Sequence, residues 1–479
     1  MSSGPGRTAS GLGRWIRRPS ADVPGGWEGL VIDKASQHQR TAYHEDRTVG
    51  TLELFFDLVY VYAMSEVTTL MLANVSWTGF GRGALALAAI WWAWENYAWL
   101  TNTFEHADPP ARILIYFAMA AMLIAATALP NAFGKMALVF ATAYVFVRLL
   151  HVVLLLRTTR GDEQLRTPTL ELVPYLLAGS GLIVVGAFMT SPYRELLWLV
   201  SAMIDLSGPL IAGRAGWRVS PRYFVERHGL IVIIALGESI MSVGGGAKDS
   251  IGRPLTAVAM VTAVLIAAGM WWAYFEPSPR AAARLRRLSP ARRARHARDA
   301  YSYLHLVLVT GIVFFALGVY KAVGNPDEPM APLPGVALSG GVALFYLGDV
   351  AYRWRDHRRI MVDRLVAGGI MAATVPLTVQ LHALTTLTVL LLVSALRVIW
   401  EVQGGNDPLR VPLSWRLRPG HAGTRTGGRS RAATWAVRQG LPGRAPRWRR
   451  AGPGGGRRRR RGLSDPRRVA RQGNSRRTV

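Results

Sequence analysis

The sequence of 479 residues contains no cysteine and only 29 acidic residues against 57 Lys and Arg. Without cysteine, the chain cannot form disulfides, use thiolate chemistry or hold a metal through sulfur. Its histidines lack metal-binding spacing, and the run VGGGAK, which begins at Val243, lacks the spacing of a phosphate-binding loop. We therefore expect no metal site and no cofactor.

Long apolar runs fill the middle of the chain. Half of the residues are hydrophobic, and each run approaches the ~20 residues with which a helix crosses a bilayer. The pattern predicts an all-α, polytopic integral membrane protein with about twelve transmembrane helices. The expected spans are 51–73, 80–101, 113–129, 134–156, 170–189, 195–212, 224–243, 254–275, 301–323, 333–352, 363–377 and 379–400, and the last two could instead form one span.

The loops between these spans alternate between many and few basic residues. Lys and Arg are frequent in the first 50 residues and in every second loop, most of all in RAAARLRRLSPARRARHAR at 280–298. Because short cytoplasmic loops accumulate Lys and Arg, both termini are expected in the cytoplasm. The polar N-terminal segment has no apolar core of a signal peptide, so no removable leader is expected.

The C-terminal segment carries most of the net charge of +28, since Gln403 to Val479 holds 21 Arg and only two acidic residues. It is rich in Gly, Pro and Arg and has almost no apolar periodicity, which predicts a disordered cytoplasmic tail over 401–479. We expect this tail and the basic loops to contact membrane lipids of the anionic inner leaflet. RNA is an alternative partner for the tail, but no specific nucleic acid is expected.

A weak internal repeat suggests two similar halves. At an offset of 172, the first and seventh spans align three identical residues, and the next helix in each half contains Trp-Trp-Ala. Two halves of six spans would have the same orientation, as in parallel repeats of transporters. The expected segments are 1–50 (cytoplasmic), 51–212 (first half), 213–400 (second half) and 401–479 (tail). The aligned pairs are Leu58 with Leu230, Ala63 with Ala235 and Glu66 with Glu238.

Three carboxylates lie in the apolar stretch LELFFDLVYVYAMSE, residues 52–66: Glu53, Asp57 and Glu66. Glu53 is close to the membrane surface, where it could cap the helix or reach water. An ionised group near the bilayer centre costs at least ~2.5–3.5 kcal/mol, so the deeper Asp57 and Glu66 should face the protein interior. Glu238 lies equally deep in the seventh span. Asp57, Glu66 and Glu238 are therefore the candidate proton, cation or substrate site.

Basic residues inside the spans could neutralise these acids. Arg148 in the fourth span is a candidate counter-ion for Asp57, and Arg227 is a second candidate counter-ion, which could also pair with Glu226. Gly237 is expected to let another backbone approach Glu238. Single buried histidines and Trp pairs are more typical of core packing than of a ligand site.

The segments LELFFDLVYVYAMSE and ERHGLIVIIALGESI (226–240), with WWAWENY and WWAYFEP in the following helices, resemble the bacterial low temperature requirement A (LtrA) family. The resemblance covers about residues 45–400 and implies a multi-pass protein of the bacterial cytoplasmic membrane. Tyr60 and Tyr62 depart mildly from the family pattern and would add two hydroxyls near the acids. The family motif falls on Glu53, Phe55, Phe56, Asp57, Arg227, His228, Gly229, Gly237, Glu238 and Ser239.

Three functions fit this sequence. The first is a secondary transporter or ion pathway in which buried carboxylates bind a proton or cation. The second is a membrane scaffold or a component of a cold or stress response, in which the acids only pair with Arg148 and Arg227. The third is an intramembrane enzyme acting on lipid, although the chain has no recognisable catalytic nucleophile. A fold alone does not decide among them.

Overall fold

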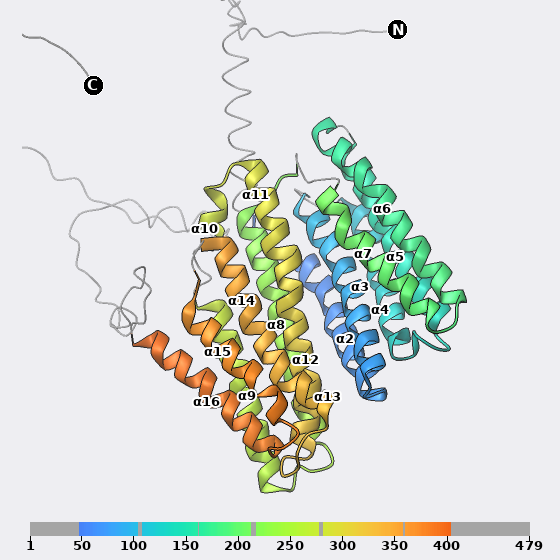
Figure 1. Cartoon of the computed structure of the whole chain (residues 1–479). Helices are drawn as coiled ribbons and strands as arrows, with labels where there is room; N and C mark the ends of the chain where they lie inside the picture. The colour runs from blue at the N-terminus through green and yellow to red at the C-terminus, as the bar shows by residue number, and fades with distance from the viewer. Residues whose placement is uncertain are drawn as a thin grey trace, which may run out of the picture. The chain divides into compact units, whose positions relative to one another are not determined.

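The computed structural model describes residues 47–103, 108–160, 162–211, 217–276, 281–357 and 360–403. Within these ranges every regular element is a helix (Figure 1), which confirms the predicted all-α class. The segment expected at 1–50 lies almost wholly outside the described residues, as does nearly all of the tail at 401–479.

The first part of the chain forms six long helices. Two of them begin at a capping residue. The side chain of Ser76 accepts a hydrogen bond from Gly79 N at 3.1 Å, and that of Asp108 accepts one from Ala111 N at 2.9 Å. Such caps satisfy amides that have no partner inside a helix. The elements are α2 (Thr51–Ala73), α3 (Trp77–Asn102), α4 (Pro109–Ala128), η1 (Leu129–Asn131), α5 (Ala137–Thr158), α6 (Glu163–Phe188) and α7 (Tyr193–Ile211).

The second part is less regular, because two π-helical segments, η3 and η4, lead into its long helices. The basic stretch at 280–298 contains the short helices α10 and α11. The elements are α8 (Pro221–Ala247), α9 (Pro254–Phe275), α10 (Ala281–Arg286), α11 (Pro290–Ala297), η3 (Arg298–Tyr303), α12 (Leu304–Gly324), α13 (Pro332–Gly335), η4 (Val336–Gly340), α14 (Gly341–His357), α15 (Val362–Ala373), η5 (Val375–Leu377) and α16 (Ala383–Val402).

Nine helical segments in the described part are long and apolar enough to cross a membrane. Helices α3, α7 and α15 are not among them. Helix α15 has only 12 residues, which span ~18 Å at 1.5 Å per residue, whereas a hydrocarbon core is ~30 Å thick. The predicted number of about twelve spans therefore stays a prediction.

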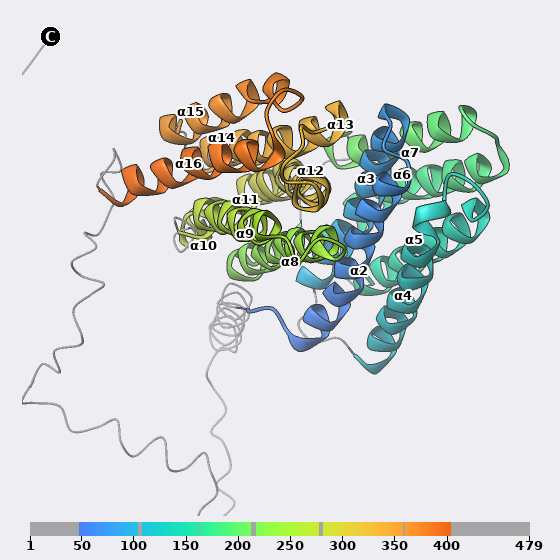
Figure 2. The ribbon, with the colours of Figure 1, turned by 90° about the horizontal axis from the view of Figure 1, so that it is seen from below.

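Each part packs its helices in the same order. In the first, α2 packs on α3 and α4, α3 on α5 and α7, and α4 to α7 pack in succession. In the second, α8 packs on α9 and α12, α9 on α14 and α16, and α12, α14, α15 and α16 pack in succession. The two parts meet where α2 and α3 contact α8 and α12, as the view along the helices shows (Figure 2).

Glycines allow helices of the second part to approach closely. A Cβ atom on Gly246 of α8 would lie 2.2 Å from the backbone oxygen of Tyr320 in α12, and one on Gly311 of α12 would lie 2.7 Å from the backbone nitrogen of Phe345 in α14. Both contacts are too short for any side chain. Helix α12 is consequently held against its neighbours at backbone distance.

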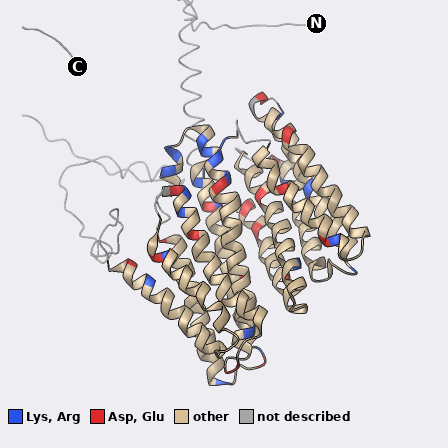
Figure 3. Ribbon diagram, in the orientation of Figure 1, with Lys and Arg blue, Asp and Glu red and all other residues tan. Residues whose placement is uncertain are grey.

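Charged residues are distributed unevenly along the helices (Figure 3). Lys and Arg gather around α10 and α11, whereas several acidic residues lie well inside the bundle. Part of the basic charge is neutralised locally, since Arg284 pairs with Asp356 at 2.6 Å and Arg298 with Asp299 at 2.7 Å.

Candidate functional site

Asp57 and Arg227 form a buried ion pair between α2 and α8. Arg227 Nη2 lies 2.9 Å from Asp57 Oδ1, and Trp94 Nε1 of α3 donates to the same oxygen at 2.8 Å. Asp57 is 2% exposed and Arg227 is 0% exposed. Because neither side chain reaches water, each charge needs the other to compensate it, and removing one would leave an uncompensated buried charge. Of the two predicted counter-ions, Arg227 is the one that contacts Asp57.

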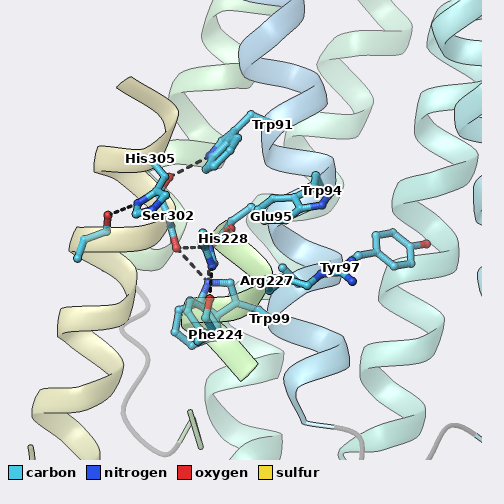
Figure 4. Close-up of polar contacts among 12 residues, drawn as sticks. Trp91, Trp94, Glu95, Tyr97, Trp99, Phe224, Arg227, His228, Ser302 and His305 are labelled. Atoms are coloured by element: carbon cyan, nitrogen blue, oxygen red, sulfur yellow. Dashed lines mark hydrogen bonds and ion pairs between the residues drawn. The ribbon is translucent and has the colours of Figure 1, made fainter. Parts of the chain in front are cut away.

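Glu95 of α3 and His228 of α8 form a second buried contact beside this ion pair (Figure 4). His228 Nε2 lies 3.1 Å from Glu95 Oε2, and both residues are 0% exposed. Trp99 Nε1 donates to Glu95 Oε1 at 2.6 Å, and the hydroxyl of Ser302 in η3 donates to the same oxygen. Glu95 is therefore held by three helical elements at once.

Aromatic and histidine rings surround His228. Its Nδ1 is 2.8 Å from the backbone oxygen of Phe224, whose ring stacks on the imidazole. His305 of α12 lies with its ring centroid 5.2 Å from that of His228, and its Nε2 is 2.8 Å from the hydroxyl of Tyr274. These rings exclude bulk water from the polar contacts.

Glu238 and Glu66 belong to a second polar layer on the same α2–α8 contact. Glu238 is 2% exposed, and Ser242 donates its hydroxyl to Glu238 Oε1 at 3.1 Å. Ser65, Thr68 and Glu66 of α2 lie near this carboxylate. The Thr68 hydroxyl donates to the backbone oxygen of Met64 at 3.4 Å, and Glu66 is partly exposed. Glu238 Oε2 has no hydrogen-bond partner among the described residues. Oxygen atoms from two helices thus converge on one place.

The three predicted site acids therefore lie along the same contact between α2 and α8, but at two separate positions. Nine residues separate Asp57 from Glu66, which is ~14 Å along a helix. Glu66 is near Glu238, whereas Asp57 is with Arg227. Tyr60 is buried near Asp57, whereas Tyr62 is 37% exposed.

Several expected contacts are wrong. Arg148 does not pair with Asp57, because its Nη2 lies 2.5 Å from Asp205 Oδ1 on α7. Glu226 pairs with Arg222 at 2.8 Å and not with Arg227, since a helical spacing of four brings side chains together and a spacing of one does not. Gly237 admits no close backbone, because a Cβ atom added there would meet nothing within 4 Å.

The remaining motif residues take structural positions. Glu53 pairs with Arg47 at 2.7 Å near the start of α2. Phe56 packs its ring 4.8 Å from that of Tyr97, whereas Phe55 is 54% exposed on the outer face. A Cβ atom on Gly229 would lie 3.4 Å from the ring of Phe275, and Ser239 is buried.

The sequence did not single out Glu95, Trp99 or Ser302 as site residues. The one available signal for Glu95 is its place just after the repeated Trp-Trp-Ala. The partner His228 is 133 positions away, so only the packing of α3 on α8 brings them together. Within the described ranges, no group of three His, Cys, Asp or Glu is placed to hold a metal ion.

Comparison with known proteins identifies the family. The family model described as bacterial low temperature requirement A protein (LtrA) matches residues 48–399. The chain belongs to the LtrA family. The match spans α2 to α16, so both polar layers lie within the family region. Together with the nine apolar helices, it supports a multi-pass membrane protein.

An uncharacterized protein of Rhizobium meliloti (strain 1021) is 26% identical to this chain over 389 residues, which cover 78% of this chain and 94% of the relative. No solved structure matches the chain. The LtrA relationship therefore supplies a family and a membrane setting, and the chemistry has to be argued from the buried groups.

Proposed function

We propose that this LtrA protein is a secondary transporter or ion pathway in which carboxylates between α2 and α8 bind a proton or a cation. The observation that carries the proposal is the second polar layer, where the buried Glu238 accepts a hydrogen bond from Ser242 and lies near Ser65, Thr68 and Glu66 of α2. The acids Asp57, Glu66 and Glu238 are its ion-handling residues.

The chemistry of this layer favours a bound positive charge. Two carboxylates repel each other when both are ionised in a place of low dielectric constant, and a proton or cation between them removes the repulsion. Carboxylate and hydroxyl oxygens are also suitable ligands for hard cations. Glu238 Oε2, which lacks a hydrogen-bond partner among the described residues, is the atom available to the ion.

The repeated packing order supports two parallel halves, 51–212 and 213–400. Each helix pair in contact within the first half has its counterpart in the second, with α2 corresponding to α8 and α3 to α9. Transporters built from repeats place their sites where the repeats meet. Here α2 and α8 meet, and both polar layers lie between them.

The basic end of the bundle supports a proposed orientation in the membrane. Lys and Arg gather around α10 and α11 (Figure 3), which belong to one of the basic loops. By the positive-inside rule, this end would face the cytoplasm of a bacterial cell, in line with the proposed cytoplasmic location of both termini. The Arg-rich tail and basic loops would lie on the anionic lipids of the inner leaflet.

A scaffold without transport is the second candidate, and the ion pair of Asp57 with Arg227 favours it. This pair is buried and its carboxylate is further fixed by Trp94, so it suits a role in aligning α2 with α8. The second layer differs in its neighbours, because hydroxyls and the carboxylate of Glu66 act on Glu238. Asp57 Oδ2 and Glu238 Oε2 both lack a hydrogen-bond partner among the described residues.

The test is ion and solute flux through liposomes that contain the purified full chain. A screen of labelled sugars, amino acids and ions under an imposed proton gradient should find a flux that empty liposomes lack. Glu238→Gln keeps the shape of the side chain but removes its charge, and should abolish that flux without loss of folded protein. Glu226→Gln, on the same helix but paired with Arg222 at the surface, is the matched control and should keep the flux.

Two results would contradict the proposal. One is a flux that Glu238→Gln leaves unchanged, which would exclude this carboxylate from the ion site. The other is a complete absence of flux together with unfolding of Glu238→Gln, which would assign the acid to the architecture and favour the scaffold.

A further inference from the structure

The position of one proton on His228 follows from its surroundings. Nδ1 is 2.8 Å from the backbone oxygen of Phe224, and a carbonyl oxygen only accepts hydrogen bonds. Nδ1 therefore carries a hydrogen, because a lone pair facing that oxygen would be repelled. In a neutral imidazole with hydrogen on Nδ1, Nε2 is an acceptor.

The contact between Nε2 and Glu95 Oε2 then requires a second proton. If His228 were neutral and Glu95 ionised, two acceptors would face each other at 3.1 Å with no exposure to water. If His228 were charged and Oε2 protonated, two hydrogens would face each other. Glu95 Oε1 cannot relieve this clash readily, since Trp99 and Ser302 already donate to it. A single proton shared by Nε2 and Oε2 satisfies both atoms.

We infer that Glu95 and His228 form a binding site for one exchangeable proton between α3 and α8. This inference rests on the proposed function and deepens it, because it names the coupling ion as the proton. In one form the proton is on Nε2 beside a carboxylate; in the other it is on Oε2 and Nε2 accepts from it. Both forms have the same total charge and the same bond from Nδ1 to Phe224.

The groups around the pair restrict the proton to it. Asp57 on α2 is neutralised by Arg227, the neighbour of His228 on α8. His305 on α12 is satisfied as a neutral ring, since Nδ1 faces the backbone oxygen of Ala300 at 2.8 Å and Nε2 accepts from the hydroxyl of Tyr274 at 2.8 Å. Tyr301 packs on His228 only through its ring, 5.1 Å between centroids.

The location links the proton to movement of the protein. Glu95 belongs to the first group of six long helices and His228 to the second, so the proton bridges the junction of the two. Separating α3 from α8 would part the two atoms that share the proton and give each access to another partner. Release or uptake of the proton would accompany such a separation.

The proton can be located directly by nitrogen NMR of the full chain labelled with ¹⁵N-histidine. His228→Gln identifies the signal among the ten histidines of the chain. In the native protein, Nε2 of His228 should show the shift of a protonated or strongly hydrogen-bonded nitrogen. In Glu95→Gln, where the amide donates to Nε2, it should show a neutral ring without that proton. A native Nε2 that is neither protonated nor hydrogen-bonded would overturn the inference.

Proton flux, followed with a pH-sensitive dye trapped in liposomes, tests the role in transport separately. Glu95→Gln should stop proton movement, whereas Glu163→Gln, at the exposed start of α6, should not. If the native protein moves no protons or solutes, the proposed function fails. The NMR measurement then still shows whether Glu95 and His228 share a proton. Flux that persists in folded Glu95→Gln would exclude this proton from transport. If Glu95→Gln does not fold, His228→Gln provides the same flux test from α8.

Discussion

The buried ion pair of Asp57 with Arg227 makes the largest energetic prediction. At 2.9 Å and an effective dielectric constant of about 20, the Coulomb attraction is ~6 kcal/mol. Desolvation of both groups offsets much of it, but removing one partner leaves the other charge buried and alone. Asp57→Asn and Arg227→Gln should each lower the free energy of unfolding by ~3–5 kcal/mol.

The double variant distinguishes the cost of one uncompensated charge from the cost of losing the ion pair itself. Replacing both charges, as in Asp57→Leu with Arg227→Met, removes the uncompensated charge and should recover most of the loss, because such pairs are often neutral relative to apolar residues. The exposed pair of Arg253 with Asp327 at 2.5 Å is the control, and Asp327→Asn should cost less than ~1 kcal/mol.

Reversible unfolding in mixed detergent micelles, followed by tryptophan fluorescence, measures these differences. The reasoning is refuted if Asp57→Asn and Arg227→Gln each cost no more than the control. It is also refuted if Asp57→Asn combined with Arg227→Gln costs as much as these two single variants added together, since the charges would then be independent.

Two further predictions concern packing and pH. Gly246→Ala should destabilise the protein by ~1–3 kcal/mol, because the added Cβ atom would lie 2.2 Å from the backbone oxygen of Tyr320. Gly244→Ala on the same helix is the control and should not destabilise it, because its Cβ atom would meet nothing within 4 Å. Equal unfolding curves for the two variants would contradict the close approach. The amide of Ala111 and the guanidinium of Arg157 lower the pKa of Asp108 below its ordinary value of 3.8. Its contribution to stability should therefore be complete above about pH 3.8 and be lost as the pH falls through the lower pKa of the folded state. Asp108→Asn should reduce this acid sensitivity, and an unchanged acid limb of the stability curve would count against the cap.

The sequence predicted the helices better than the contacts between them. The expected span 51–73 coincides with α2 and 254–275 with α9, because apolar runs bounded by polar loops determine where a membrane helix begins and ends. The π-helical segments at 298–303 and 336–340 were not predicted, since they depend on how α12 and α14 pack and not on a local pattern.

Partners of the charged side chains were only partly predictable. The repeat aligned Glu66 with Glu238 as equivalent positions of two halves, but it did not predict that they lie near each other where α2 packs on α8. The sequence could not distinguish Arg148 from Arg227 as the partner of Asp57, because the choice depends on which helix packs against α2. Glu95 and His228 meet for the same reason, through contacts between α3 and α8 that no local spacing encodes.

Proton and cation flux through liposomes, compared between the native chain, Glu66→Gln and Glu238→Gln, tests the central claim most directly. The account predicts that the native protein conducts or couples an ion, and that either substitution strongly reduces the flux while the protein remains folded. Equal flux in all three proteins would contradict a role for the α2–α8 carboxylates in moving ions.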